Sequence, residues 1–324
     1  MISKTYSSCI AVASASTANL GPGYDVFGLG LDACKDRVEI SKVQNKAKRI
    51  TKRITIRMSG EHGEKIPSRT EANSAGIVIK KMSEDFGLDY RLNVDILKGV
   101  PTGYGMGSSA ASAAAAAMAF DGLFDLKIKK TKLVEYAAEG EIASAGTRHY
   151  DNVSGSVLGG FIIVRTTPEL EFIKIEPPKN LVLVIAVPMI KVPRKKTAVA
   201  RSLLPDPIPL KSVIHNVANA STVVAGFILK DIEMIAKGID DIIVEPARSH
   251  LTPNYEAVKR NALKAGALAV TISGAGPSMI SITDNYEHGK KVADAMATGF
   301  KVAKIASRTF VCHSSKGAKI VDRK

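Results

Sequence analysis

The hydrophobic positions in the first half of the chain follow two periods, one typical of helices and one typical of strands. Apolar residues that recur about every four positions predict helices over 73–86 and 131–145, and an alanine-rich stretch predicts another over 108–124. Alternating runs rich in β-branched residues predict strands at 6–13, 37–43, 54–58 and 92–97. The first half therefore combines strands with helices.

A polar, proline-bearing passage at 166–180 separates this half from the next. The second half opens with an unbroken apolar run at 181–188, typical of a buried strand, and continues into a helix at 210–229. The sequence shows no internal repeat. The pattern predicts an α+β protein of two domains, 1–165 and 166–324.

The charge of the chain is large but dispersed. A formal net charge of +14 suits a protein that binds nucleic acid, an anionic membrane or a phosphorylated small molecule. The densest basic run, at 42–57, has no aromatic residue to stack on bases. We therefore interpret that run as a solvated face and expect no nucleic-acid partner.

Other features argue against a membrane, secreted or zinc protein. The longest alanine-rich run, 110–120, is shorter than the roughly 20 apolar residues that span a bilayer. The N-terminal residues lack a basic region followed by an apolar stretch. Cys9, Cys34 and Cys312 have no C-x-x-C spacing, which predicts buried apolar cysteines. We expect a cytoplasmic protein with no membrane partner.

The strongest local signal is a glycine-rich turn that runs directly into the alanine-rich helix, PTGYGMGSSAASAAAAAMAF. Helix N-termini present unpaired N–H groups, and Gly103, Gly105 and Gly107 let the backbone approach a phosphate without a clashing Cβ. A helix capped by Ser108 is the alternative, but it leaves three alternate glycines unexplained. No lysine follows the glycines, so the Walker pattern is absent. The turn predicts a phosphate site of another type.

Residues 101–111 match P-x-x-x-G-[LM]-G-S-S-A-A, and the turn resembles the phosphate loop of the GHMP kinases. Two further segments lie where that family has its other signatures, STANLGPGYDVFG at 16–28 and SGAGPS at 273–278. The resemblance implies ATP and Mg²⁺ as cofactors. It also implies an N-terminal domain like ribosomal protein S5 domain 2, a C-terminal ferredoxin-like domain, and an active site in the cleft between them. We expect SGAGPS to pack against the phosphate loop or the substrate, although a simple strand-to-helix turn also explains it.

Within that family, the chain resembles the homoserine kinases at three places, 16–25, 140–160 and 245–255. The first has the pattern S-x-x-N-L-G-x-G-[FY]-D, and the second resembles G-E-x-x-x-x-G-x-x-H-x-D-N. The resemblance implies phosphorylation of the side-chain hydroxyl of L-homoserine by ATP, in threonine biosynthesis, and a homodimer. Two alternatives remain open, a GHMP kinase for mevalonate or a sugar, and a basic nucleic-acid-binding protein that shares the S5-like fold.

The resemblance also implies roles for particular residues, beginning with the nucleotide and the metal. Glu141 lies four residues after Ala137 and eight after Leu133, on an apolar stripe where a carboxylate needs a partner. That partner is implied to be Mg²⁺, shared with Ser109. Asn73 also fits as the N-cap of its helix. ATP is implied to contact Asn73, Pro101, Gly103, Gly105, Met106, Gly107, Ser108, Ser109 and Thr197.

The implied homoserine-binding residues are Asn19, Asp25, His149, Asn152, Arg201 and Arg248. Asp25 is expected to bind the ammonium group, and the planar forks of Arg201 and Arg248 suit an α-carboxylate. Asn19 is expected near the hydroxyl, although both it and Asp25 are common in turns for local reasons. No position is identified as a catalytic base, so we predict direct attack by the substrate hydroxyl.

Overall fold

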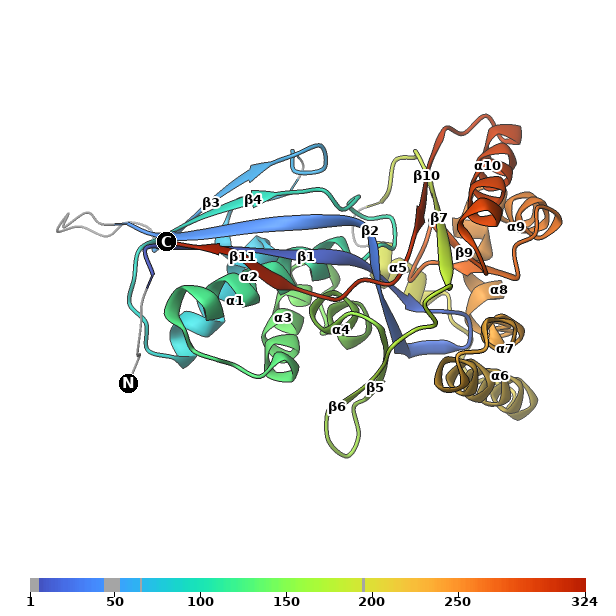
Figure 1. Ribbon diagram of the computed structural model, residues 1–324, viewed down its shortest axis with the longest axis horizontal. Coiled ribbons are helices and arrows are strands. Elements are labelled where there is room, and N and C mark those ends of the chain that lie inside the picture. Colours follow the sequence, from blue (N-terminus) through green and yellow to red (C-terminus); the bar gives the residue numbers. More distant parts are fainter. Residues whose placement is uncertain (1–5, 44–52, 65, 194–195) are drawn as a thin grey trace.

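The computed structural model describes residues 6–43, 53–64, 66–193 and 196–324. Within these residues, seven strands form one long sheet in the order β11–β1–β2–β4–β3, with β5 paired to β2 and β6 paired to β5 (Figure 1). Strands β3 and β4 are parallel, and the other neighbours are antiparallel. The strands are β1 (Ser8–Asn19), β2 (Gly23–Lys42), β3 (Ile54–Ser59), β4 (Leu92–Leu97), β5 (Phe161–Arg165), β6 (Glu171–Ile175) and β11 (Lys319–Arg323).

Helices α1 to α4 cover one face of this sheet (Figure 1). The alanine-rich α2 lies among them, buried on nearly every side, because its small side chains let neighbouring elements approach closely. The helices predicted at 73–86, 108–124 and 131–145 are confirmed as α1, α2 and α3, whereas α4 was not predicted. These helices are α1 (Ser74–Asp85), α2 (Ser108–Phe124), α3 (Lys130–Ala145) and α4 (Tyr150–Leu158).

A smaller sheet of four strands, counted over the described part of the chain, has the order β10–β7–β9–β8. Helices α9 and α10 pack on one of its faces, around a core that includes Val258, Met279 and Phe300. Its strands are β7 (Val182–Pro188), β8 (Ala269–Ile272), β9 (Met279–Thr283) and β10 (Ser307–Cys312). The remaining helices are α5 (Lys196–Ser202), α6 (Leu210–Leu229), α7 (Ile232–Gly238), α8 (Val244–Arg248), α9 (Tyr255–Lys264) and α10 (Tyr286–Val302).

A second apolar core joins the two halves of the molecule. Phe161 of β5 stacks on Phe227 of α6 with ring centroids 3.9 Å apart, and Met106 and Leu183 belong to the same cluster. Because buried aromatic area contributes strongly to packing, the two halves form a continuous interior.

The domain boundary that we place between residues 165 and 166 stays a prediction. Strand β6 lies after that point and pairs with β5, and β11 pairs with β1, for example Cys9 opposite Arg323. The large sheet is thus built from both ends of the sequence, and the second half of the chain contributes two of its strands.

The cysteines, the basic run and the long apolar helix can be compared with the predictions made from composition. Cys9 and Cys312 are buried as expected, but Cys34 is only partly buried, which corrects that prediction. Most of the basic run at 42–57 lies outside the described residues. Among the residues that the structure describes, α6 alone has the length and apolar composition that would suffice for a membrane span. Its exposed residues include Leu210, Ile214, Val217 and Ile228.

Candidate active site

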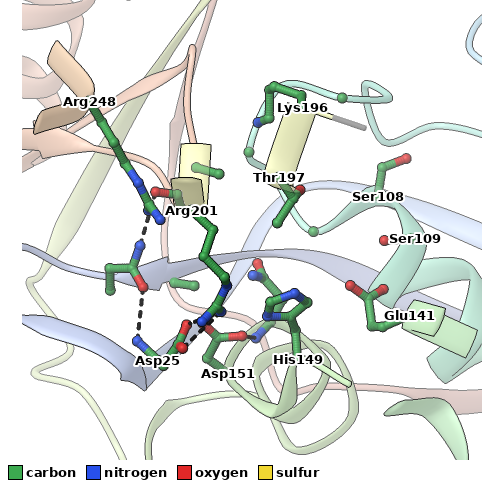
Figure 2. A pocket seen from close by; sticks show the side chains of 18 of the residues that line it. Asp25, Ser108, Ser109, Glu141, His149, Asp151, Lys196, Thr197, Arg201 and Arg248 are labelled. Carbon is green, nitrogen blue, oxygen red and sulfur yellow. Dashed lines mark hydrogen bonds and ion pairs between the residues drawn. The ribbon is translucent and has the colours of Figure 1, made fainter. Parts of the chain in front are cut away.

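A cavity of about 280 Å³ lies where the two halves meet. It is lined by the β1–β2 turn, the glycine-rich loop before α2, the helices α3, α4, α5 and α8, and the turn between β8 and β9 (Figure 2). Segments far apart in the sequence thus contribute to one polar site.

The glycine-rich loop fits so tightly that its glycines are required. Gly103, Gly105 and Gly107 all have positive φ, at 87°, 81° and 63°. A Cβ on Gly105 would lie 2.1 Å from the carbonyl oxygen of Ser273, and one on Gly107 would lie 2.1 Å from Oγ of Ser16. The Ser273 hydroxyl donates to the carbonyl of Gly105 at 2.8 Å, which confirms that SGAGPS packs against this loop.

A buried ion pair holds the loop from beneath. Lys98, at 2% exposure the largest of the fully buried side chains, donates to Asp36, to the carbonyl oxygen of Ser108 at 2.8 Å and to the hydroxyl of Ser112 at 2.9 Å. Asp36 also accepts from the backbone N–H groups of Gly99 and Val100, both at 3.0 Å. The first turn of α2 is therefore fixed to β2 and to the end of β4.

Glu141 projects from α3 toward the start of α2, and it is 5% exposed. Burial raises the pKa of its carboxyl group to about 7. A hydrogen bond with Ser109 lowers the pKa, but its effect is smaller than that of burial. The two side chains offer oxygen ligands beside the glycine-rich loop. Because Mg²⁺ is usually held by one or two protein oxygens together with phosphate oxygens, this pair fits that ion.

On the opposite side of the cavity, Asp25 and Arg201 form an ion pair with N–O distances of 2.8 and 3.0 Å. The guanidinium groups of Arg201 and Arg248 both lie over the ring of Tyr24, 5.4 and 4.9 Å from its centroid. Arg248 is 4% exposed and donates to the carbonyl of Ala200 at 3.0 Å. Tyr24 therefore fixes two cations beside one carboxylate.

Asn19 shapes the loop that carries Asp25. Its amide nitrogen donates to the carbonyl of Gly274 at 3.0 Å, and its amide oxygen accepts from the backbone N–H of Asp25 at 3.2 Å. Asn19 and Asp25 both adopt positive φ, an uncommon conformation for residues other than glycine. These hydrogen bonds hold the turn in a strained shape that directs the Asp25 carboxylate into the cavity.

Three neighbouring residues at the start of α4 line the middle of the cavity. Burial lowers the pKa of His149. Asp151 is 4% exposed, and burial, with a smaller contribution from the charge of Asp25, raises its pKa to about 6. Asn152 accepts from the hydroxyl of Ser16 at 3.3 Å. The H-x-D-N pattern pointed to His149 and Asn152, but the sequence reasoning passed over the aspartate between them.

Most of the predicted site residues line this one cavity. Those that do are Asn19, Asp25, Gly103, Gly105, Gly107, Ser108, Ser109, Glu141, His149, Asn152, Thr197, Arg201 and Arg248. Asn73, Pro101 and Met106 do not line it. Met106 is wholly buried in the core, and Asn73 caps α1 by accepting from the N–H of Gly76 at 3.2 Å. The sequence reasoning missed Tyr24, Asp151 and Lys196, all of which line the cavity.

Comparison with known proteins agrees with this geometry. Residues 73–160 match the GHMP kinases N terminal domain, and residues 223–302 match the GHMP kinases C terminal domain. Together the two matches span more than half of the chain. They define the class as the GHMP kinases.

Particular relatives narrow the class. A homoserine kinase of Methanococcus maripaludis is 40% identical over 82% of this chain and 85% of its own length. The crystal structure of homoserine kinase from Cytophaga hutchinsonii has a TM-score of 0.90 at 33% identity and covers 98% of both chains. A mevalonate kinase of methicillin-resistant Staphylococcus aureus, at 15% identity, a TM-score of 0.61, and coverage of 94% and 98%, shares only the fold. The chain therefore belongs to the homoserine kinases of the GHMP kinase family.

The predicted fold class, the two-domain GHMP kinase fold, is confirmed by these matches. The alternative of a nucleic-acid-binding protein has no support among them.

Proposed function

We propose that this cavity transfers the γ-phosphoryl group of ATP to the side-chain hydroxyl of L-homoserine, giving O-phospho-L-homoserine for threonine biosynthesis. The main observation in support is that two groups of side chains with different chemistry lie at opposite ends of one cavity. The glycine loop, Ser109 and Glu141 form a phosphate and metal end, and the Asp25–Arg201 pair with Arg248 forms a zwitterion end.

The charges at the second end favour an amino acid over mevalonate. An α-carboxylate matches the fork of Arg248, and an ammonium group matches the carboxylate of Asp25. Mevalonate carries a carboxylate but no ammonium group, and a sugar carries neither. A ligand with both charges would give the buried Arg248 a carboxylate partner and give the partly exposed Asp25 a second cation beside Arg201.

The site acts mainly by positioning and by neutralising charge. The backbone N–H groups at the start of α2 face the phosphates, while the pair of Asp36 and Lys98 keeps that turn rigid. Ser109 and Glu141 would hold Mg²⁺, which would neutralise charge on the phosphate oxygens. The bond between the γ-phosphorus and ADP breaks, the substrate oxygen bonds to phosphorus, and the hydroxyl proton leaves to phosphate or solvent.

A product assay tests the proposal. The purified protein is incubated with Mg·ATP and, separately, L-homoserine, mevalonate and galactose, and both ADP and the phosphorylated product are measured. We expect turnover of homoserine alone. Turnover of another alcohol would keep the kinase chemistry but overturn the zwitterion end, and no turnover of any would overturn the proposed function.

Asp25→Asn is expected to raise the KM for homoserine about tenfold, since a hydrogen bond to a charged group contributes about 1.5–3 kcal/mol and Asp25 is partly exposed. Steady-state kinetics with each substrate varied in turn measure the change. The KM for ATP is the internal control and should stay constant. An unchanged KM for homoserine would remove the ammonium-binding role of Asp25.

Asp151→Asn tests the prediction of direct attack. Asp151 is the buried carboxyl group between the two ends, and without a base role its loss is expected to leave kcat within about tenfold of the wild type, because general bases contribute 10²–10⁴-fold. Binding of both substrates is measured by calorimetry in parallel, with thermal unfolding as the folding control. A larger loss of kcat with both substrates still bound would make Asp151 the base.

We also propose a cytoplasmic homodimer that buries the exposed apolar side of α6 against a second copy. Leu210, Ile214 and Val217 are 73%, 61% and 60% exposed on one side of that helix, which is a large apolar surface for a monomer. Ile214→Asp is expected to shift the mass in light scattering from dimer to monomer, whereas the exposed Lys291→Asp on α10 should not. A monomeric wild type would contradict the dimer.

A further inference from the structure

Two cations of the cavity, Arg248 and Lys196, form no ion pair with a carboxylate of the described residues. Over residues 6–43, 53–64, 66–193 and 196–324, the ion pairs of the cavity include Asp25 with Arg201, but none includes Arg248 or Lys196. Arg248 lies at the zwitterion end and fits the α-carboxylate. No part of homoserine has been assigned to Lys196, so the proposed binding of homoserine does not explain why this lysine lines the cavity.

Lys196 is the first residue of α5, and its ammonium group donates to the carbonyl oxygen of Gly276. That carbonyl faces the phosphate loop, because a Cβ on Gly105 would lie 2.8 Å from it. Figure 2 shows Lys196 and Thr197 between Arg248 and Ser108 in the view. The ammonium group is therefore placed at the phosphate end of the cavity, above the glycine loop.

In the described part of the chain, no carboxylate forms an ion pair with this ammonium group. The turn Ser273–Ser278 and the glycine loop carry no titratable side chain except Tyr104, while Arg201 of α5 and Arg248 of α8 are both positive. The carboxyl groups that line the same cavity are those of Asp25, Glu141 and Asp151. Burial, together with the charge of Arg248, lowers the pKa of Lys196 to about 7. Lys196 is partly buried and its ammonium group donates to a carbonyl oxygen, so an anion bound beside it would stabilise the charged form.

We propose that Lys196 is a catalytic residue that binds the transferred phosphoryl group and takes up a proton when Mg·ATP enters the site. The inference rests on the proposed kinase function. The proton comes from solvent and stays on Nζ through the transfer, so Lys196 stabilises the negative charge on the phosphoryl oxygens without exchanging a proton with the substrate.

The direction of the proton movement follows from the two states. Phosphate favours the charged form of Lys196, so binding raises its pKa above the value in the free protein. Below about pH 7, Lys196 is already protonated in the protein without nucleotide, so nucleotide binding is accompanied by little proton uptake. Above about pH 7, nucleotide binding is accompanied by the uptake of a proton. The contribution of Lys196 to nucleotide affinity is therefore complete below about pH 7 and declines as the pH rises toward the pKa of the bound state.

The test compares the wild type with Lys196→Met, Lys196→Arg and the control Lys191→Met, an exposed lysine that precedes α5 and does not line the cavity. Proton uptake on binding the Mg²⁺ complex of the β,γ-imido analogue of ATP is measured by calorimetry in two buffers of different ionisation enthalpy. At about pH 8 the wild type and K191M are expected to take up about one proton more than K196M or K196R, and at about pH 6 the difference should vanish.

The kcat values of the variants give a second test. K196M is expected to lose about 10²-fold in kcat, the scale of removing one charge-stabilising donor, while K196R keeps more of it because the guanidinium group stays charged. If K196M is unstable in a thermal unfolding control, proton uptake is compared between K196R and the wild type.

The possible outcomes distinguish a failure of the Lys196 role from a failure of the proposed kinase function. Equal proton uptake in the wild type, K196M and K196R, or an unchanged kcat in K196M, overturns the role of Lys196. If the wild type binds the analogue with Lys196-dependent proton uptake but phosphorylates none of the three alcohols, phosphate binding by Lys196 stands and the proposed function fails.

Discussion

Glu141→Gln is expected to lower kcat about 10³-fold, since a bound metal ion supplies several kcal/mol of charge stabilisation in phosphoryl transfer. Glutamine has nearly the same volume as glutamate, so the packing of the buried side chain on α3 should persist. The change removes a negative ligand, so we also expect a higher Mg²⁺ concentration for half-maximal binding of the nucleotide complex. Kinetics at varied Mg²⁺ and calorimetry with the ATP analogue measure both effects.

Glu135→Gln is the matched control on the same helix, because Glu135 is partly exposed and pairs with Lys132 on the surface. It should leave kcat and the Mg²⁺ dependence unchanged. If Glu141→Gln retains wild-type activity at low Mg²⁺, Glu141 does not hold the metal, and the apolar stripe of α3 would be carrying a purely structural carboxyl group.

Lys98→Met is expected to destabilise the protein by about 3–5 kcal/mol, the usual cost of removing one partner of a buried ion pair. Asp36, which is fully buried, would lose its cation and keep only the hydrogen bonds from Ser112, Gly99 and Val100. The free energy of unfolding, from urea titration, measures the effect. The first turn of α2 would also loosen, so we expect a higher KM for ATP in the fraction that folds.

Lys81→Met is the control, because Lys81 pairs with Asp85 on the surface of α1 at a nitrogen–oxygen distance of 2.6 Å. Solvent screens that pair, so its loss should hardly change the free energy of unfolding. The double variant Asp36→Asn/Lys98→Met removes both buried charges and should recover part of the lost stability. A single variant Lys98→Met as stable as the wild type would show that the network does not fix the loop.

The parts of the fold that the sequence predicts well are those with local causes. The four-residue spacing of apolar positions is enough to place α1 and α3, and the carboxylate of Glu141 falls on the buried side of α3 as expected. Strands β1 and β2 extend well beyond the predicted ranges. Residues 14–30 include four glycines and a proline, which have low strand propensity, so the local pattern did not predict a strand there. Their pairing with neighbouring strands outweighs that local preference.

The site shows the same division. The glycine loop is evident from the sequence because its glycines cluster within a few positions, and backbone geometry alone requires them. The ion pair of Asp36 and Lys98 joins residues 62 positions apart, and nothing near either residue marks it as buried. Lys196 looks like one member of a basic run, KVPRKKT, and only the arrangement around Gly276 distinguishes it. Contacts across the fold therefore decide which charges the chemistry uses.

Strand β11 makes the order of synthesis matter for this molecule. Residues 319–323 form the edge of the large sheet beside β1, so that sheet stays one strand short until this segment, far along the chain from β1, has left the ribosome. An unpaired edge of β1 would be exposed to other nascent chains during that time, and such edges promote association between molecules. The cell that makes this enzyme thus has an interval in which the strands of the first half still depend on a segment that is translated much later.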